Sequence, residues 1–269
     1  MIASSSNSHI KRIQKLMKNA RFRRQEQAFI VEGWKMADEA LVRGLVKSLY
    51  LSERAEGEYT KRQQSGKPAP TDGSVPVHIV SDRCFRDVAD TINPQGILAE
   101  VSMPRYDREQ ILSSRRAALL CLEDIQDPGN LGTIMRTAEG AGMTALVLSK
   151  GCVDLFNPKV VRSTMGALFR VPYLVCDDMS TEVERLKQEG FVIYAAHLSA
   201  EREYTDEHYA DRAAVLIGNE AGGLSDAVSG RADTLLKIPM EGELESLNAA
   251  VSAALFMYEL YRSRKNVLQ

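Results

Sequence analysis

The sequence predicts an α/β protein in which a parallel sheet occupies the second half of the chain. Short apolar runs alternate with helical patterns over about 150 residues, from residue 117 onwards. A shorter set of alternating segments fills residues 1–104, and a charged stretch without an apolar pattern separates the two. Alternation of strand and helix favours a parallel sheet covered by helices on both faces. We therefore expect a small α/β domain at residues 1–104, a linker at 105–116 and a larger domain at 117–269.

The first half begins as a helix and continues as a sheet. Ile13, Leu16 and Met17 form an apolar stripe at helical spacing, and the segment WKMADEALVRG is an amphipathic helix that Gly44 ends. Residues 53–74 are polar and rich in Gly and Pro, which predicts a mobile loop. The expected strands of this half are FIVEG, LVKSLYLS, VPVHIVS and GILAEVSMP.

The second half alternates throughout. Its expected strands are AALLCLEDI, TALVLSK, YLVCDD, FVIYAAHL, AAVLIGNE and TLLKIPM. Its expected helices are NLGTIMRTAEGAG, NPKVVRSTMGA, STEVERLKQEG and SLNAAVSAALFMYELYRSR. Because ligands of such sheets bind beyond the carboxyl ends of the strands, the side chains directly after each strand are the candidates for function.

The composition excludes several classes of protein. With 269 residues, 44% of them hydrophobic, the chain can bury a core of its own. The N-terminus MIASSSNSHIKRIQ lacks the apolar segment of a signal peptide, and no apolar run is long enough to span a membrane, so we expect a cytoplasmic protein. The four cysteines and four histidines lie at irregular spacings, which argues against a metal site and predicts reduced, mostly buried thiols.

Basic residues gather at the N-terminus of a chain whose net charge is −2. Residues 1–24 contain no acidic residue, and such an arm is typical of a surface that binds phosphates. The alternative is an ordinary solvated helix face. The basic residues of the arm are Lys11, Arg12, Lys15, Lys18, Arg21, Arg23 and Arg24.

Two segments after the first strands of the second half carry candidate polar side chains. In DPGNLGTIMRTAEG, Asn130 is placed to cap the next helix and Arg136 lies two turns further, on a face of small residues from which it can reach a cleft. In NPKVVRSTMGALFRVP, Lys159 and Arg162 share one side of a short helix and Arg170 follows nearby, a set that suits a polyanionic substrate. A helix cap and ordinary surface charge are the alternatives for both segments.

The segment LIGNEAGGLS places Asn219 and Glu220 at the carboxyl end of a strand. Gly222 and Gly223 allow a sharp turn and a close approach by a ligand or by another part of the backbone. A plain tight turn needs one glycine and no Asn-Glu pair, so the segment favours a functional loop over a structural one.

The last segment, KIPMEGELESLNAAVSAALFMYEL, leads into the final helix. Ser246 is expected to cap this helix, with Asn248 in its first turn, where the side chain can face the cleft. The helix is apolar on nearly all sides, which predicts contact with a second subunit. The sequence contains no GxGxxG after a strand, no GxxxxGK[ST] and no GxSxG, so dinucleotide, nucleoside-triphosphate and hydrolase sites lack their usual motifs.

In this order, the four segments resemble the motifs of the SpoU class of the SPOUT superfamily, which comprises S-adenosylmethionine-dependent RNA ribose 2'-O-methyltransferases. The resemblance covers residues 117–265. The first half resembles the family's ribosomal-protein-like substrate-binding domain, most clearly in RRQEQAFIVEGWKMADEAL. The resemblance implies a parallel sheet with a trefoil knot at its C-terminal end, and a homodimer whose interface includes the last helix.

The resemblance also implies roles for individual residues. The family's catalytic positions fall on Asn130, Arg136, Glu220, Ser246 and Asn248. A guanidinium has a pKa above about 12, so we expect Arg136 to stabilise the developing alkoxide rather than to act as the base. The proton of the 2'-hydroxyl would then leave to Glu220, to a substrate phosphate or to water. The implied contacts to S-adenosylmethionine are Ala196, Gly218, Asn219, Ile238, Met240 and Leu247.

The first hypothesis is therefore an enzyme that methylates ribose 2'-hydroxyls of RNA, with large-subunit ribosomal RNA favoured by the N-terminal domain. Transfer RNA as the substrate, and a catalytically silent RNA-binding or ribosome-assembly factor on the same fold, are the alternatives. The full set of catalytic positions argues against the silent factor. The expected RNA contacts are Lys11, Arg12, Lys15, Arg23, Lys159 and Arg162.

Overall fold

The computed structural model describes residues 1–70 and 73–266 and divides into two compact units. Unit 1 consists of Met1–Arg105 and Phe156–Phe169, and unit 2 consists of Tyr106–Leu155 and Arg170–Gln269. Residues 71–72 of the expected loop and residues 267–269 of the expected second domain lie outside the described residues. Within the described ranges, no helix is both long and apolar enough to cross a membrane.

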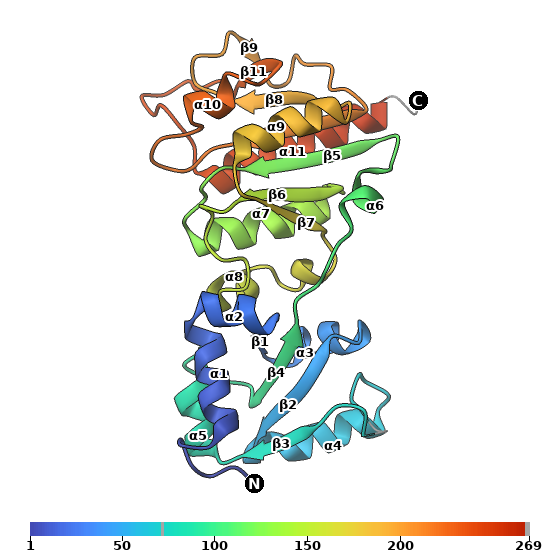
Figure 1. The fold of residues 1–269 in the computed structure, drawn as a ribbon, viewed down its shortest axis with the longest axis vertical. Helices are drawn as coiled ribbons and strands as arrows, with labels where there is room; N and C mark the ends of the chain where they lie inside the picture. Colours follow the sequence, from blue (N-terminus) through green and yellow to red (C-terminus); the bar gives the residue numbers. More distant parts are fainter. Residues whose placement is uncertain (71–72, 267–269) are drawn as a thin grey trace. The chain divides into compact units, whose positions relative to one another are not determined.

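Unit 1 is built on a four-stranded sheet with the order β1-β4-β2-β3 (Figure 1). β4 is antiparallel to β1 and to β2, and β3 is parallel to β2. β1, β2 and β3 therefore run in one direction and end at one edge. The strands are β1 (Ala28–Glu32), β2 (Val46–Ser52), β3 (Val77–Val80) and β4 (Ile97–Ser102). The helices are α1 (Ser8–Lys18), α2 (Ala20–Glu26), α3 (Trp34–Val42), α4 (Glu56–Gln64), α5 (Asp82–Val88) and α8 (Pro158–Ser163), with short 3₁₀ turns at Glu53–Ala55 and Ala167–Phe169.

The core of unit 1 confirms the apolar stripe of the first helix. Asn7 caps α1 by accepting a hydrogen bond from the His9 N–H, and Ile10, Ile13 and Leu16 are completely buried against the sheet and α5. Burial of such side chains contributes about 1.5–3 kcal/mol each. The periodic apolar positions, and not helix propensity alone, therefore fix α1 on the sheet.

The prediction of a mobile loop over residues 53–74 was wrong for its first part. Glu53–Ala55 forms a 3₁₀ turn and α4 follows directly, with Tyr59 and Arg62 buried. The Tyr59 hydroxyl donates to the Pro70 carbonyl over 3.1 Å, and so holds the chain that leaves the helix. With only one apolar residue on its buried side, this helix offered little periodic signal.

Two segments pack differently from the expectation that residues 105–116 are a linker and 117–269 a single domain. α6 (Arg108–Leu112) packs within unit 2, where Leu112 joins the core and Arg108 pairs with Glu182 and Glu189 at 2.5 and 3.0 Å. α8 instead contacts β1 of unit 1 through its buried face. Both short helices are placed by tertiary contacts that composition did not reveal.

Unit 2 contains a seven-stranded sheet with the order β7-β6-β5-β10-β8-β11-β9, and every pairing is parallel. This confirms the predicted parallel α/β fold, while the trefoil knot stays a prediction. The strands are β5 (Ala117–Leu122), β6 (Ala145–Ser149), β7 (Tyr173–Cys176), β8 (Val192–Ala196), β9 (Arg202–Glu203), β10 (Arg212–Ile217) and β11 (Thr234–Lys237). The remaining helices are α7 (Pro128–Gly140), α9 (Met179–Gln188), α10 (Asp226–Ser229) and α11 (Ala249–Asn266).

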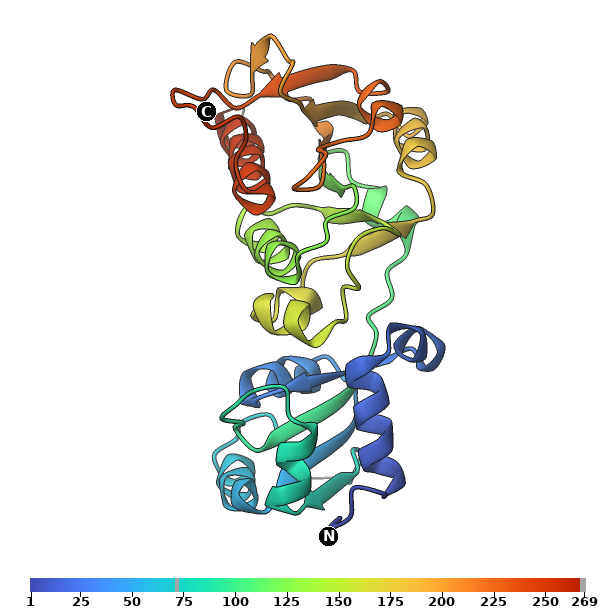
Figure 2. The same cartoon turned by 90° about the vertical axis from the view of Figure 1, so that its left-hand side faces the viewer.

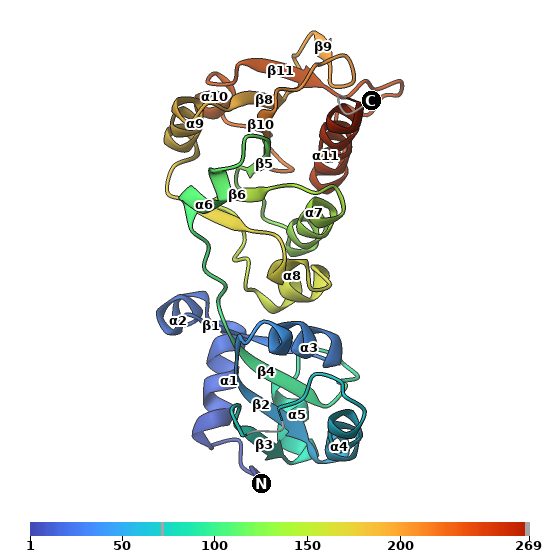
Figure 3. The ribbon, with the colours of Figure 1, turned by 90° about the vertical axis from the view of Figure 1, so that its right-hand side faces the viewer.

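Helices cover both faces of this sheet. α7 and α11 lie side by side on one face, and α9 and α10 lie on the other (Figures 2 and 3). The interior strand β5 is buried along its whole length, as expected for a strand with helices on both sides. Because all seven strands are parallel, the polar side chains that follow them gather at one edge.

Candidate active site

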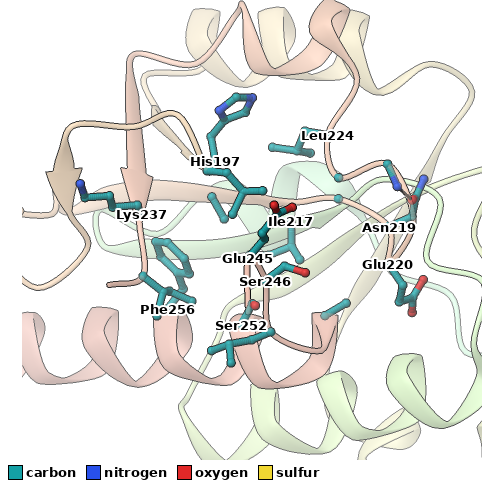
Figure 4. A pocket seen from close by; sticks show the side chains of 18 of the residues that line it. His197, Ile217, Asn219, Glu220, Leu224, Lys237, Glu245, Ser246, Ser252 and Phe256 are labelled. Atoms are coloured by element: carbon teal, nitrogen blue, oxygen red, sulfur yellow. Dashed lines mark hydrogen bonds between the residues drawn. The ribbon is translucent and has the colours of Figure 1, made fainter. Parts of the chain in front are cut away.

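A cavity of about 350 Å³ lies at the carboxyl edge of the unit 2 sheet (Figure 4). Its walls come from the loops after β8, β10 and β11 and from the first turns of α11. This volume is within the range of about 300–1,000 Å³ that is typical of small-molecule sites. The position agrees with the rule that open α/β sheets bind ligands beyond their carboxyl ends.

All six residues that the resemblance assigned to the cofactor line this cavity. Three separate loops supply them, so the parallel topology brings together residues that are far apart in the sequence. Their contact with a cofactor stays a prediction. They are Ala196, Gly218, Asn219, Ile238, Met240 and Leu247.

The two ends of the loop 218–223 come very close together, so that the backbone at Gly218 and Asn219 lies against the backbone at Gly223. Asn219 and Gly223 exchange two backbone hydrogen bonds of 3.2 and 3.1 Å, and Gly223 has φ +68°. A Cβ atom on Gly218 would lie 2.0 Å from the Gly223 carbonyl carbon, so only glycine fits at residue 218. The Asn219 side chain accepts the N–H groups of Ala221 and Gly222 at 3.0 and 2.7 Å, which closes the loop.

Three predicted catalytic side chains form a chain of hydrogen bonds. Asn130 Nδ2 donates to Glu220 Oε1 over 2.5 Å, and Asn248 Nδ2 donates to Asn130 Oδ1 over 3.0 Å. In Figure 4 the Glu220 side chain leaves the loop after β10 and points towards α7, the helix that carries Asn130. The three side chains come from three motifs, and each amide is oriented by its neighbour.

The helix caps differ from the sequence predictions. Asp127, not Asn130, caps α7 by accepting the Asn130 N–H at 2.7 Å, which leaves the Asn130 side chain for Glu220. Asn248, not Ser246, caps α11, since its Oδ1 accepts the Ala250 N–H at 2.9 Å. The cap at Asn248 holds its Nδ2 towards Asn130, so capping and positioning are performed by one side chain.

Ser246 and Arg136 are placed differently from this group. Ser246 lines the cavity beside Glu245 (Figure 4). Arg136 lies six residues beyond Asn130 on an exposed part of α7, outside the cavity lining, and has no ion pair with any residue in the described part of the chain. The structure therefore brings four of the five predicted catalytic residues to the cavity or its rim and leaves Arg136 exposed.

The charge of the cavity suits a cationic ligand. The carboxylates of Glu220 and Glu245 line it, and Lys237 is the one lysine or arginine among its lining residues. Lys237 and Phe256 lie at the end away from Glu220 (Figure 4). Apolar walls that also carry two carboxylates fit S-adenosylmethionine, whose adenosine presents an apolar surface and whose sulfonium is positively charged.

Thiol and metal chemistry have no support at this site. All four cysteines are free; Cys84 and Cys121 are buried, and Cys152 and Cys176 are half-buried. Burial raises the pKa of Cys152 and raises that of Cys176 to about 12, so both stay protonated and unreactive at neutral pH. Throughout the described ranges, no three His, Cys, Asp or Glu side chains form a group that could hold a metal ion.

The family description "SpoU rRNA Methylase family" matches residues 117–258, slightly more than half of the chain. The chain belongs to the SpoU rRNA methylase family. Residues 7–99 match the description "MRM3-like substrate binding domain". Both halves of the SpoU resemblance are therefore confirmed at the level of family.

Similar proteins span almost the whole chain. The 23S rRNA (guanosine(2553)-2'-O)-methyltransferase RlmP of Bacillus subtilis is 34% identical over 260 residues, which cover 96% of this chain and 98% of that protein. A solved RNA 2'-O ribose methyltransferase is 30% identical, with a TM-score of 0.80 and coverage of 98% and 99%. An AdoMet-bound rRNA methyltransferase from Sinorhizobium meliloti is 26% identical, with a TM-score of 0.82 and coverage of 100% and 98%.

The predicted RNA contacts of this SpoU family member divide into two groups. Arg23 is 3% exposed and donates to the Leu16 and Met17 carbonyls, so the structure contradicts its assignment to RNA. Arg12 also has internal partners, Glu26 at 2.7 Å and Glu100 at 2.8 Å, which raise the pKa of its guanidinium.

The other predicted contacts remain at the surface. Lys11, Lys15 and Lys159 are exposed, and the Lys15 ammonium lies 5.5 Å from the centre of the Phe22 ring. Arg162 is half exposed and forms an ion pair with Asp90. Lys11 and Lys15, together with Lys18, lie on one exposed face of α1, which we call the α1 lysine face.

Several residues that line the cavity were not predicted from the sequence. His197 directly follows β8 and Lys237 ends β11, so the rule that ligands bind at strand ends would have found both. Ser252 and Phe256 come from α11, one turn apart, and share a helix face. Because α11 is apolar on nearly all sides, the sequence did not indicate which of its faces lines the cavity.

Proposed function

We propose that this protein transfers the methyl group of S-adenosylmethionine to a ribose 2'-hydroxyl of RNA, with large-subunit ribosomal RNA as the substrate. The observation that carries this proposal is the hydrogen-bonded group of Glu220, Asn130 and Asn248 at the rim of a cavity that fits the cofactor, in a chain of the SpoU family. Family membership supplies the reaction class. The geometry supports the choice of the residues that would perform it.

The residues of the cavity would hold the cofactor, and Glu220 would take the proton. S-adenosylmethionine supplies an electrophilic methyl group bound to a sulfonium. The Glu220 carboxylate is well placed to accept the proton of the attacking hydroxyl, and its bond to Asn130 fixes one oxygen so that the other is available. Asn248 fixes Asn130 in turn, and the cap on α11 keeps this arrangement rigid.

Arg136 would stabilise negative charge as it develops on the ribose oxygen. It is exposed and has no ion pair in the described part of the chain, so its guanidinium is available to a substrate. A fixed cation near a developing alkoxide lowers the barrier without transferring a proton. Arg136→Lys keeps the charge, and near-normal turnover of this variant would argue against a specific role for the guanidinium.

The preference for ribosomal RNA comes from two observations. Residues 7–99 match a substrate-binding domain, and the similar RlmP of Bacillus subtilis is named for 23S rRNA. Transfer RNA remains the second candidate substrate. We propose a cytoplasmic location, because the similar RlmP comes from a bacterium, in which ribosomal RNA is made and modified in the cytoplasm.

We also propose a homodimer formed through α11. Val251, Tyr258 and Tyr261 are 47%, 50% and 37% exposed and lie on one face of this helix, although other faces of α11 are completely buried. An exposed apolar stripe of this kind is typical of a symmetric interface. Tyr258→Glu should convert the protein to a monomer in light scattering, whereas an unchanged mass would argue against this interface.

The proposed function is tested by methyl transfer. The full-length protein is incubated with labelled S-adenosylmethionine and with ribosomal or transfer RNA from a strain that lacks the gene. We expect label in the large-subunit ribosomal RNA and none in transfer RNA. Label in transfer RNA alone would reassign the substrate, and absence of label from both would favour a non-catalytic RNA-binding factor.

A further inference from the structure

Unit 1 contains a second cavity, of about 230 Å³, that none of the predicted RNA contacts lines. It lies at the edge where β1, β2 and β3 end, between the start of α3 and the loop that precedes β4. Ser52, the last residue of β2, and Asp82, which follows β3, both belong to its wall. Unit 1 thus has its own candidate ligand site at the carboxyl ends of its parallel strands.

One wall of this cavity is an aromatic ring held in place. Trp34 is the only tryptophan of the chain and is partly exposed in the cavity. The Arg62 guanidinium lies 4.6 Å from the centre of its ring, and Arg62 is itself 6% exposed and paired with Asp38. Because a buried cation and its partner support the indole, the cavity has a rigid flat surface on which a base can stack.

An amide with free donors lies beside this ring. Gln95 Oε1 accepts the Trp34 backbone N–H over 2.9 Å, which assigns the orientation of the Gln95 amide. Within the described residues Gln95 Nε2 has no hydrogen-bond partner, and its two N–H groups remain available at the cavity. An oriented amide next to an aromatic ring can recognise the edge of a stacked base.

Two arginines supply positive charge at the rim. Arg54 pairs with Asp82 at 2.8 Å, with 69% of its side chain exposed, whereas exposed Arg86 has no ion pair within the described residues. Glu58 and Asp82 also line the cavity, so it lacks the continuous positive charge that would follow a duplex backbone. The charge pattern favours one nucleotide with its phosphate near Arg86.

We propose that this cavity binds an unpaired nucleotide of the RNA substrate, with the base on Trp34, its edge on Gln95 and its phosphate near Arg86. The inference rests on the proposed function, since it takes RNA as the substrate. A base in a duplex has no free face, so the cavity selects a loop, bulge or end of the RNA. This site contributes to the choice of substrate and is separate from the methyl-donor cavity of unit 2.

The single tryptophan allows a direct test, because a base stacked on Trp34 changes the fluorescence of that ring. The full-length protein is titrated with a short single-stranded RNA of mixed sequence, with the same RNA as a duplex, and with inorganic polyphosphate. We expect quenching by the single strand and little by the duplex or the polyphosphate. Binding of the single strand without any change in Trp34 fluorescence would overturn the proposal, and so would equal quenching by the duplex or by the polyphosphate.

Matched variants extend the test to affinity. Trp34→Ala should weaken binding of the single strand about 10-fold or more, and Trp34→Phe should restore most of that affinity because it keeps the aromatic face. Arg86→Ala should weaken binding several-fold. Arg83→Ala, which removes an exposed arginine of the same helix outside the cavity lining, should not. Equal effects of Arg86→Ala and Arg83→Ala would contradict a specific phosphate contact.

The outcomes separate this inference from the proposed function. Quenching by RNA without methyl transfer would support the nucleotide site and argue against the enzyme. Methyl transfer with unchanged KM for RNA in Trp34→Ala and Gln95→Leu would support the enzyme and overturn the nucleotide site. We expect both variants to raise KM for RNA and to leave affinity for S-adenosylmethionine unchanged, since neither residue belongs to the unit 2 cavity.

Discussion

At the carboxyl edge of the unit 2 sheet, residues far apart in the sequence lie close together in the structure. In the basic arm of unit 1, neighbouring residues instead have different surroundings. At the sheet edge, Asn130, Glu220 and Asn248 lie as much as 118 residues apart and are joined by hydrogen bonds. In the arm, Lys11 and Arg12 are neighbours in sequence, yet one is exposed and the other pairs with two carboxylates.

The difference follows from the two kinds of secondary structure. Parallel strands all end at one edge, so residues just after each strand converge whatever their distance along the chain. A helix turns successive residues by about 100°, so a run of like charge divides between a packed face and a solvated face. A motif that directly follows a strand is therefore a better predictor of a functional site than a run of charged residues on a helix.

The largest effect is expected at the unit 2 edge, where the backbone at Gly218 lies against the backbone at Gly223. Gly218→Ala places a Cβ atom 2.0 Å from the Gly223 carbonyl carbon, so we expect a loss of about 3 kcal/mol or more of unfolding free energy and loss of cofactor binding. Gly222→Ala is the control, because its nearest contact would be 3.7 Å. Thermal unfolding and cofactor titration measure both. A Gly218→Ala protein as stable as the Gly222→Ala control would show that this close approach is not required.

The hydrogen-bond chain should matter to turnover more than to binding. Asn130→Ala removes the donor to Glu220 and the acceptor of Asn248, and we expect kcat to fall about 100-fold with little change in cofactor affinity. If the residues act as one unit, the Asn130→Ala/Asn248→Ala double variant loses little more than the worse single variant. Additive losses would mean that the two amides act independently.

Arg12 and its neighbour Lys11 differ in their contacts, although both lie in one turn of α1. Arg12→Ala leaves Glu100, which is 4% exposed, without its cation, and we expect a loss of about 2 kcal/mol of unfolding free energy. Lys11→Ala removes an exposed charge, and its effect on stability should stay within about 0.5 kcal/mol. Urea unfolding compares the two. Equal stabilities would contradict an inward role for Arg12.

The smallest effect is expected on the α1 lysine face. Changing Lys11, Lys15 and Lys18 together to Gln should weaken RNA binding several-fold and reduce the slope of log affinity against log salt by about 2. Stability should not change, because all three are exposed. An unchanged salt slope would show that this face does not contact RNA.

The sequence predicted the parts of the molecule that follow from periodicity and motif order. The parallel fold and the α1 stripe could be predicted because each depends on local pattern, whereas the six residues assigned to the cofactor came from the resemblance to the SpoU family, and all six line the cavity. The inward turn of Arg23 and the pairing of Arg12 could not, since both depend on partners elsewhere in space.

The helix caps show the same limit on a smaller scale. Asp127 and Asn130 are both favourable cap residues three positions apart, and the sequence does not decide between them. In the structure Asp127 takes the cap, which leaves Asn130 for Glu220. The short helices α4 and α6 were not predicted, because they have no stripe of apolar residues at helical spacing and are held in place by long-range contacts.

The most direct test of the catalytic role of the unit 2 edge is the chemical position of the transferred methyl group. Ribosomal RNA labelled by the protein and S-adenosylmethionine is hydrolysed in alkali, which cannot cleave next to a 2'-O-methylated ribose. We predict that the label appears in alkali-resistant dinucleotides with the unaltered protein and falls about 100-fold or more with Glu220→Gln. Label in mononucleotides, which would place the methyl group on a base, or full activity of Glu220→Gln, would contradict the proposed reaction at this site.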